Sequence, residues 1–238
     1  MRIFGISDLH LSLGVDKPMD IFGDHWEDHH LQIEAAWRER VRDDDIVLCP
    51  GDTSWGMKPN EAQPDLEWLE ALPGRKILVK GNHDYWWPGT RKKLRDLLPD
   101  SIHTLKKNAL VLDGTGFIGV RGSDIRRPAD KSFDEHRATI EREITEFRAS
   151  IVDLRENHEG YDRIVALFHY PPIDLDGMPS VYSGMVEASG AELCVYGHLH
   201  TKEWCSRGFE GQHNGVEYRL LSCDHLEFRP VLLRDEVR

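Results

Sequence analysis

The sequence has few cysteines and no apolar run long enough to cross a membrane. Its four cysteines form no Cys-x-x-Cys pair, and Cys49 and Cys194 stand in apolar, strand-like runs where a free thiol behaves as a small hydrophobic side chain. No run approaches the roughly 20 apolar residues of a membrane span, and no charged leader with a cleavage site is visible. We therefore expect a reduced, cytoplasmic protein without a membrane partner.

A net positive charge, internal repeats and low-complexity segments are also lacking. The formal net charge is −12, so strong nonspecific binding to nucleic acid or to an anionic membrane is disfavoured, although a local basic patch is not excluded. With 238 residues, of which 39% are hydrophobic, the chain is long enough to bury a sizeable core. We expect one domain over residues 1–238, with nucleic acid an unlikely partner.

The first hundred residues alternate short apolar runs with segments of helical period. The strand-like runs are RIFGIS, DIVLCP and KILVKG, and the helical segments between them are LQIEAAWRERV and DLEWLEAL. Strands that alternate with helices in this way form βαβ units, which predicts a parallel sheet in this part of the chain.

The rest of the chain has a different pattern. Two short runs, NALVLDG and GFIGVRG, predict an antiparallel hairpin, and a long polar helix is expected over residues 133–157. Strand-like runs follow in RIVALF and ELCVYG, and we expect the final pair, GVEYRLLS and LEFRPVLL, to close a second sheet. Two facing sheets with helices outside account for this order better than one doubly wound sheet.

Five of the apolar runs end in side chains that commonly bind metals. The residues are, in chain order, Asp8 and His10, Asp52, Asn82 with His83, His169, and His198 with His200. Each has an ordinary explanation on its own, such as a turn carboxylate or a satisfied histidine. Those explanations make it improbable that all five strand ends in one chain carry such residues. In open α/β sheets ligands bind at the carboxyl ends of the strands, so these side chains can converge on one site.

In order and type, these motifs resemble those of the calcineurin-like metallophosphoesterase superfamily. They read DxH, GD, GNHD, a lone histidine and GHxH, and they extend from residue 8 to residue 200. The phrases GDTSWGM, GNHDYWW and YGHLH are further similar to a little-characterised bacterial branch of predicted phosphohydrolases. The resemblance implies a four-layer α/β/β/α sandwich with two facing mixed sheets and a dinuclear metal site at the carboxyl ends of the strands.

The resemblance also implies a division of the metal ligands. Asp8, His10, Asp52 and His200 would hold one ion, and Asn82, His169 and His198 the other, with Asp52 bridging the two. Mixed imidazole, carboxylate and amide ligands suit Mn²⁺, Fe or Zn²⁺ in a divalent or mixed-valence pair. Two ions about 3.5–4 Å apart can share a hydroxide and direct it at phosphorus. We therefore expect direct hydrolysis of a small phosphomonoester or phosphodiester.

Within GNHD, His83 is expected to donate a proton to the leaving oxygen or to act as a cationic stabiliser. Asp84 would either orient a neighbouring imidazole or cap a helix that begins near Pro88. Trp86 and Trp87 are expected to pack in the core or at its rim, with platforms for base stacking as the alternative. In the Ser/Thr protein phosphatases of the superfamily, an aspartate three residues after the second motif orients the catalytic histidine, whereas this chain has Trp55 there.

Two further clusters and two other functions remain open. The stretch DHWEDHH is expected to form a solvated loop or, alternatively, a lid, and Arg121, Arg126 and Arg127 either pair with surface carboxylates or reach a substrate phosphate. A nuclease of the same superfamily is disfavoured by the acidic charge. A noncatalytic scaffold is disfavoured because it would have little reason to keep all seven ligands and His83. The sequence does not indicate the oligomeric state.

Overall fold

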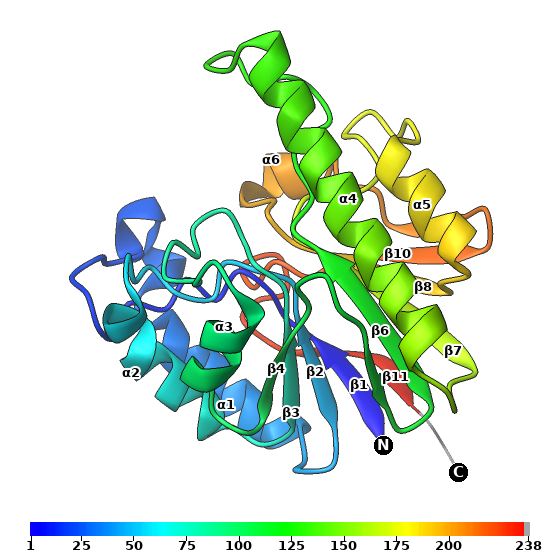
Figure 1. The fold of residues 1–238 in the computed structure, drawn as a ribbon. Coiled ribbons are helices and arrows are strands. Elements are labelled where there is room, and N and C mark those ends of the chain that lie inside the picture. The colour runs from blue at the N-terminus through cyan, green and yellow to red at the C-terminus, as the bar shows by residue number, and fades with distance from the viewer. Residues whose placement is uncertain (236–238) are drawn as a thin grey trace. The chain divides into compact units, whose positions relative to one another are not determined.

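The computed structural model describes residues 1–235 and divides the chain into two compact units. Among the described residues, the first unit comprises residues 1–104 and 221–235, and the second comprises residues 105–220. Each unit contains one mixed β-sheet and its own helices (Figure 1). The prediction of an α/β fold with two mixed sheets is therefore confirmed. The expectation of a single domain stays a prediction.

The first unit is built on a five-stranded sheet with the order β11-β1-β2-β3-β4. The strands β1 to β4 run parallel, as the βαβ pattern predicted, and β11 runs antiparallel to β1. The strand bounds are β1 Arg2–Gly5, β2 Ile46–Cys49, β3 Arg75–Leu78, β4 Ile102–Thr104 and β11 Val231–Asp235.

Three α-helices and two short 3₁₀ helices complete the first unit. They are η1 Asp20–Phe22, η2 Asp24–Trp26, α1 His29–Arg40, α2 Pro59–Glu70 and α3 Arg91–Leu97. Trp37 of α1, Leu66 of α2 and Leu94 of α3 share one buried cluster with Val47 and Leu78 of the sheet. The stretch DHWEDHH thus forms η2 and the start of α1, and its members Trp26 and His29 are buried.

The second unit is built on a six-stranded sheet with the order β5-β6-β7-β8-β10-β9. Its four central strands are parallel, whereas β5 and β9 at the edges are antiparallel to their neighbours. The bounds are β5 Leu110–Leu112, β6 Thr115–Val120, β7 Arg163–Phe168, β8 Leu193–Tyr196, β9 Gly211–His213 and β10 Val216–Leu220. The predicted hairpin is confirmed as β5 and β6, whose turn residues Asp113 and Gly114 both have positive φ.

Two helices, α4 Phe133–Asn157 and α5 Val181–Ser189, cover one face of this sheet (Figure 1), and a short helix α6 spans Thr201–Cys205. The ring of Phe168 in β7 contacts Phe147 of α4 and Tyr182 of α5, with centroid distances of 4.7 and 5.8 Å. The long helix begins at the predicted residue because Ser132 and Glu135 form a capping box.

One prediction about the sheets is wrong. The last two strand-like runs do not close the second sheet together, because β10 pairs with β8 and β9, whereas β11 pairs with β1 of the first sheet. Strand propensity predicted both strands, but it carries no information about which neighbour completes the hydrogen-bond ladder. The chain after residue 220 therefore returns to the first unit.

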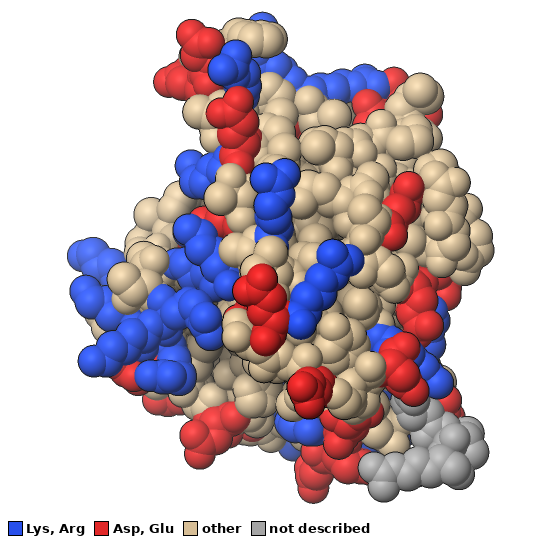
Figure 2. All heavy atoms as spheres, turned by 45° about the vertical axis from the view of Figure 1, so that its right-hand side comes forward, with Lys and Arg blue, Asp and Glu red and all other residues tan. Residues whose placement is uncertain are grey.

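The surface charge is unevenly distributed despite the net charge of −12. On the face drawn in Figure 2, lysine and arginine side chains gather in one patch, while acidic side chains are more frequent above and below it. No helix within residues 1–235 combines the length and hydropathy needed to span a bilayer.

Candidate functional site

The predicted site residues follow the carboxyl ends of neighbouring parallel strands in each unit. In the first unit Asp8 follows β1, Asp52 follows β2, and Asn82 with His83 follows β3. In the second unit His169 follows β7, and His198 and His200 follow β8. Five of the eight predicted site residues therefore belong to the first unit and three to the second.

Backbone hydrogen bonds connect the segments that follow β1 and β2. The N–H of Asp8 donates to the Gly51 carbonyl at 3.0 Å, and the N–H of His10 donates to the Asp52 carbonyl at 2.9 Å. The Ser222 hydroxyl donates to Asp8 Oδ2 at 3.2 Å, and a ring nitrogen of His29 lies 2.9 Å from the Leu9 carbonyl. The two backbone bonds join the DxH segment to the GD segment. The bonds from Ser222 and His29 fix the DxH segment from other parts of the same unit.

The carboxylates of Asp8 and Asp52 lie close together in the interior. Each offers an oxygen within 4.8 Å of the other, and the two residues are 0% and 2% exposed. His10 Nε2 lies 3.8 Å from Asp52 Oδ2, and the N–H of His83 donates to Asp52 Oδ1 at 2.7 Å. Two buried carboxylates at this separation repel each other, so the arrangement favours a cation beside them.

Asp52 leaves no room for a side chain at Gly81. A Cβ on Gly81 would collide with the Asp52 carboxylate and with the Asp52 backbone nitrogen. The glycine of the GNHD motif therefore allows the turn after β3 to approach the turn after β2 closely. Asn82 and His83 lie in this same turn.

The suggested role of Asp84 as a helix cap is wrong, and the suggested orientation of an imidazole stays a prediction. Its carboxylate accepts hydrogen bonds from the backbone N–H groups of Thr53, Ser54 and Gly81 and from the Trp86 indole, at 2.8–3.2 Å. The cap of helix α3 is instead Thr90, whose side chain accepts from the N–H of Lys93. Burial raises the pKa of the Asp84 carboxyl, and the N–H donors oppose that rise. Asp84 therefore ties the GD turn to the GNHD turn.

The tryptophans behind GNHD pack in the core, as predicted. Trp86 and Trp87 are 1% and 5% exposed, and their ring centroids are 5.2 Å apart. A different tryptophan, Trp55, contacts two predicted site residues. Its ring stacks on His10 at 4.9 Å and lies 4.4 Å from the His83 ring. The sequence showed Trp55 only as a missing aspartate, and no signal in it predicted these ring contacts.

In the second unit, His169 and His198 lie side by side. Their ring centroids are 5.0 Å apart, and the ring of Tyr170 lies 4.1 Å from that of His198. The N–H of Gly197 donates to the His169 carbonyl at 3.1 Å, which links the segments after β7 and β8. Tyr170 was not among the predicted site residues, although its position directly after His169 could have indicated that it lies at the site.

Four of the seven predicted metal ligands have left-handed backbone conformations. The φ values are 57° at Asp8, 44° at His10, 50° at Asp52 and 73° at His198. Such values are uncommon outside glycine and cost about 1–3 kcal/mol where the surroundings impose them. Their concentration at these positions indicates that side-chain placement, rather than backbone stability, determines the local conformation.

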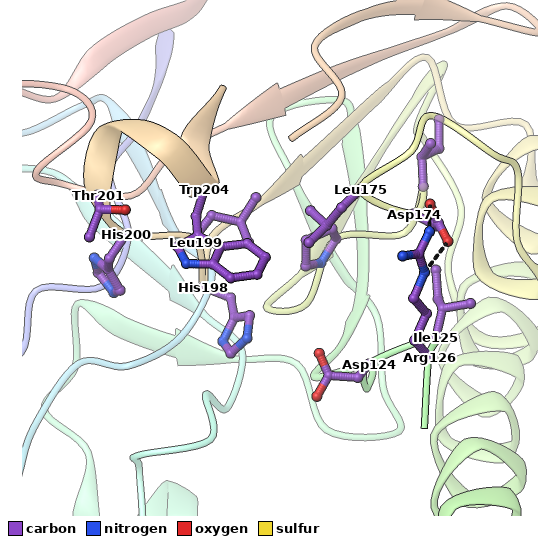
Figure 3. A pocket seen from close by; sticks show the side chains of 12 residues that line it. Asp124, Ile125, Arg126, Asp174, Leu175, His198, Leu199, His200, Thr201 and Trp204 are labelled. Carbon is purple, nitrogen blue, oxygen red and sulfur yellow. Dashed lines mark hydrogen bonds and ion pairs between the residues drawn. The ribbon is translucent and has the colours of Figure 1, made fainter. Parts of the chain in front are cut away.

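The three arginines of the VRGSDIRRP stretch bind acceptors within the second unit. Arg121 Nη2 lies 2.6 Å from Glu143 Oε1, and Arg126 forms ion pairs with Asp174 and Asp176. Arg127 donates to the Lys131 carbonyl. Arg126 also lines a cavity that contains His198 and His200 (Figure 3). The expected pairing with surface carboxylates is confirmed for Arg126, whereas the Glu143 carboxylate that binds Arg121 is buried.

Comparison with known proteins gives one family. The model of the calcineurin-like phosphoesterases matches residues 1–202. The gene 66 proteins of Mycobacterium phages D29 and L5 are 35% identical over 126 residues and 39% identical over 80 residues, which cover 50% and 33% of this chain. The chain spans 61% and 37% of the lengths of these two relatives.

Solved structures with low sequence identity have a similar fold. The phosphopantetheinyl hydrolase of Mycobacterium tuberculosis aligns with a TM-score of 0.59 and 15% identity, over 100% of this chain and 98% of its own. At this identity the likeness concerns the fold alone.

Proposed function

The chain belongs to the calcineurin-like phosphoesterase family, whose members are metal-dependent phosphoester hydrolases, and on that premise we propose that it hydrolyses a small phosphomonoester or phosphodiester with two transition-metal ions. The observation that carries the proposal is the buried pair of carboxylates, Asp8 and Asp52, within 4.8 Å of each other and beside His10. Such a pair is costly without a cation and favourable with one.

The donor set fits two ions of intermediate softness. Imidazole, carboxylate and amide groups suit Mn²⁺, Fe or Zn²⁺ better than Ca²⁺ or Mg²⁺, which prefer all-oxygen sites. In this proposal Asp8, His10, Asp52 and His200 would hold one ion. Asn82, His169 and His198 would hold the second ion together with Asp52.

When bound, the two ions supply Lewis acidity and activate water for direct attack on phosphorus, without a phosphoenzyme. The water oxygen forms a bond to phosphorus, the bond from phosphorus to the leaving oxygen breaks, and the leaving oxygen needs a proton. We assign the donation of that proton to His83. Its backbone N–H donates a hydrogen bond to Asp52 Oδ1 and its imidazole packs against the Trp55 ring, so the side chain is held in one position.

Asp52→Asn tests the proposal. The change is nearly isosteric, and it removes the shared anion, so both ions should be lost together and hydrolysis should fall to background. Elemental analysis, circular dichroism and turnover of an aryl phosphate and its diester provide the measurements. Asp96→Asn, at an exposed position of α3, is the matched control. Two bound ions with near-normal turnover in Asp52→Asn would overturn the assignment.

A further inference from the structure

The second unit contains a cavity of about 390 Å³ whose walls are mainly apolar. The apolar lining consists of Ile125, Pro171, Ile173, Leu175, Leu199 and Trp204. Its volume lies at the lower end of the range for pockets that hold small organic ligands, roughly 300–1,000 Å³. A cavity of this size with this lining is suited to a carbon skeleton of modest length.

Two of the predicted metal ligands line the same cavity. Figure 3 shows His198 and His200 on one side of it and Leu175, Ile125 and Arg126 on the other. An ester whose phosphate binds at these histidines would therefore extend its alcohol part across the cavity. His198, Leu199 and His200 are consecutive residues after β8, so the apolar lining begins directly beside the two histidines.

The exposed wall of the cavity is held by charged contacts. Trp204 is 45% exposed, and the guanidinium of Arg207 lies 5.2 Å from its ring centroid. Arg207 Nη2 lies 3.2 Å from Asp176 Oδ1, and Asp176 also pairs with Arg126. These contacts connect helix α6 to the segments around residues 126 and 176, so a large apolar side chain is kept at the rim although it faces solvent.

The backbone from His198 to Thr201 is strained at two positions. The φ values are 73° at His198 and 64° at Thr201, and positive φ is a genuine outlier for a β-branched residue such as threonine. Strain of this kind persists where the surroundings over-determine it, and it is concentrated at binding sites. The strained segment presents His198, Leu199, His200 and Thr201 to one cavity.

We propose that this cavity receives the leaving alcohol of the substrate, and that this alcohol is an uncharged organic group with a largely apolar carbon skeleton. The inference rests on the proposed function, because it places the phosphate of the same molecule at the metal site whose proposed ligands include His198 and His200. Water supplies the oxygen that binds phosphorus, and the departing alkoxide takes up a proton and leaves the cavity as the alcohol.

The charges of the lining argue against a second phosphate on the substrate. Arg126 and Asp174, two charged members of the lining, bind each other. The Asp124 carboxylate also lines the cavity, and it would repel an anionic leaving group. A nucleoside polyphosphate or a phosphorylated acidic peptide therefore fits this lining poorly, whereas an alkyl or aryl alcohol fits it well.

A series of alkyl phosphonates tests the inference by binding. Methyl, butyl and octyl phosphonate are titrated calorimetrically into the metal-loaded protein, and the matching alkyl phosphates are assayed as substrates. Each added CH₂ group that enters the cavity should tighten binding about 2–4-fold, which follows from roughly 0.8 kcal/mol per buried CH₂, until the cavity is filled. Trp204→Ala and Leu175→Ala should each reduce the octyl-to-methyl preference about 3–10-fold.

Phe133→Ala is the matched control, because it removes an exposed aromatic side chain of the same unit that does not line the cavity, and it should keep the full preference. Hydrolysis of the esters with a flat phosphonate series, or with a preference that Trp204→Ala leaves intact, would overturn the cavity inference while the proposed function stands. A metal-loaded protein that hydrolyses no ester of the series or its diesters would overturn the proposed function, and the leaving-group assignment with it.

Discussion

The Trp55 indole lies 4.4 Å from the His83 imidazole, centroid to centroid, and it also stacks on His10 with an angle of 27° between the ring planes. Two further contacts hold the indole, because Lys17 Nζ lies 4.8 Å from the Trp55 ring centroid and the indole N–H donates to Met19 Sδ at 3.1 Å. In the sequence, Trp55 stands three residues after Asp52, where the resemblance to the superfamily implies an orienting aspartate in the Ser/Thr protein phosphatases. Packing against the Trp55 ring restricts the position of the imidazole.

Trp55→Ala should lower kcat about 10–100-fold, because a displaced catalytic group of this kind loses its alignment with the reacting atoms. Trp55→Phe keeps an aromatic face against both imidazoles and should restore most of the loss. The measurement is the pH profile of kcat and KM, with metal content determined for both variants because Trp55 also contacts His10. Full activity of Trp55→Ala would show that the ring contact has no positioning role.

His83→Ala should keep both ions bound and lower turnover by roughly 10²–10⁴-fold, the range for a positioned proton donor. The loss should be smaller for a nitrophenyl ester than for an alkyl ester, since nitrophenolate leaves without a proton. His30→Ala, on helix α1, is the control. Equal losses on the two esters would instead indicate an electrostatic role for His83.

Asp84→Asn should destabilise the protein by about 2–5 kcal/mol, although the side chain keeps its size. The amide can still accept through its oxygen, but its NH₂ group faces donors that the carboxylate satisfied, so buried N–H groups lose their acceptor. Urea unfolding of the metal-free protein measures the effect, with Asp96→Asn as the exposed control. A midpoint unchanged from that of the wild type would refute the role of Asp84 in joining the two turns.

The buried carboxyl of Asp65 should make the stability of the folded protein depend on pH. Burial raises the pKa of its carboxyl from 3.8 to about 6, although the Ser54 hydroxyl and the N–H of Leu13 donate to it. The folded protein therefore holds this proton more tightly than the unfolded chain between pH of about 4 and 6. The free energy of unfolding should fall as the pH rises through that window, by at most about 3 kcal/mol from this group.

Asp65→Asn removes this titration, so the difference in unfolding free energy between wild type and variant should change with pH across the window and level off on either side of it. Guanidinium unfolding at several pH values measures the difference. A constant difference from pH 4 to pH 7 would contradict the raised pKa.

Local patterns in the sequence determined most of the elements and the positions of the predicted ligands. The helix over residues 133–157 has a capping box and a regular apolar period, and the hairpin has an Asp-Gly turn, so both follow from interactions between near neighbours. Ligand-type side chains at strand ends were visible because parallel strands bring their carboxyl ends to one edge of a sheet.

Contacts between distant residues were decided only by the tertiary structure. The partner of β11, the acceptor role of Asp84 and the packing of Trp55 on His83 each join segments that are separated in the chain. An apolar or polar residue type predicts burial or exposure, but it does not specify which partner fills the space beside it. That choice depends on the packing of whole elements, because side chains in a dense interior must fit all their neighbours at once.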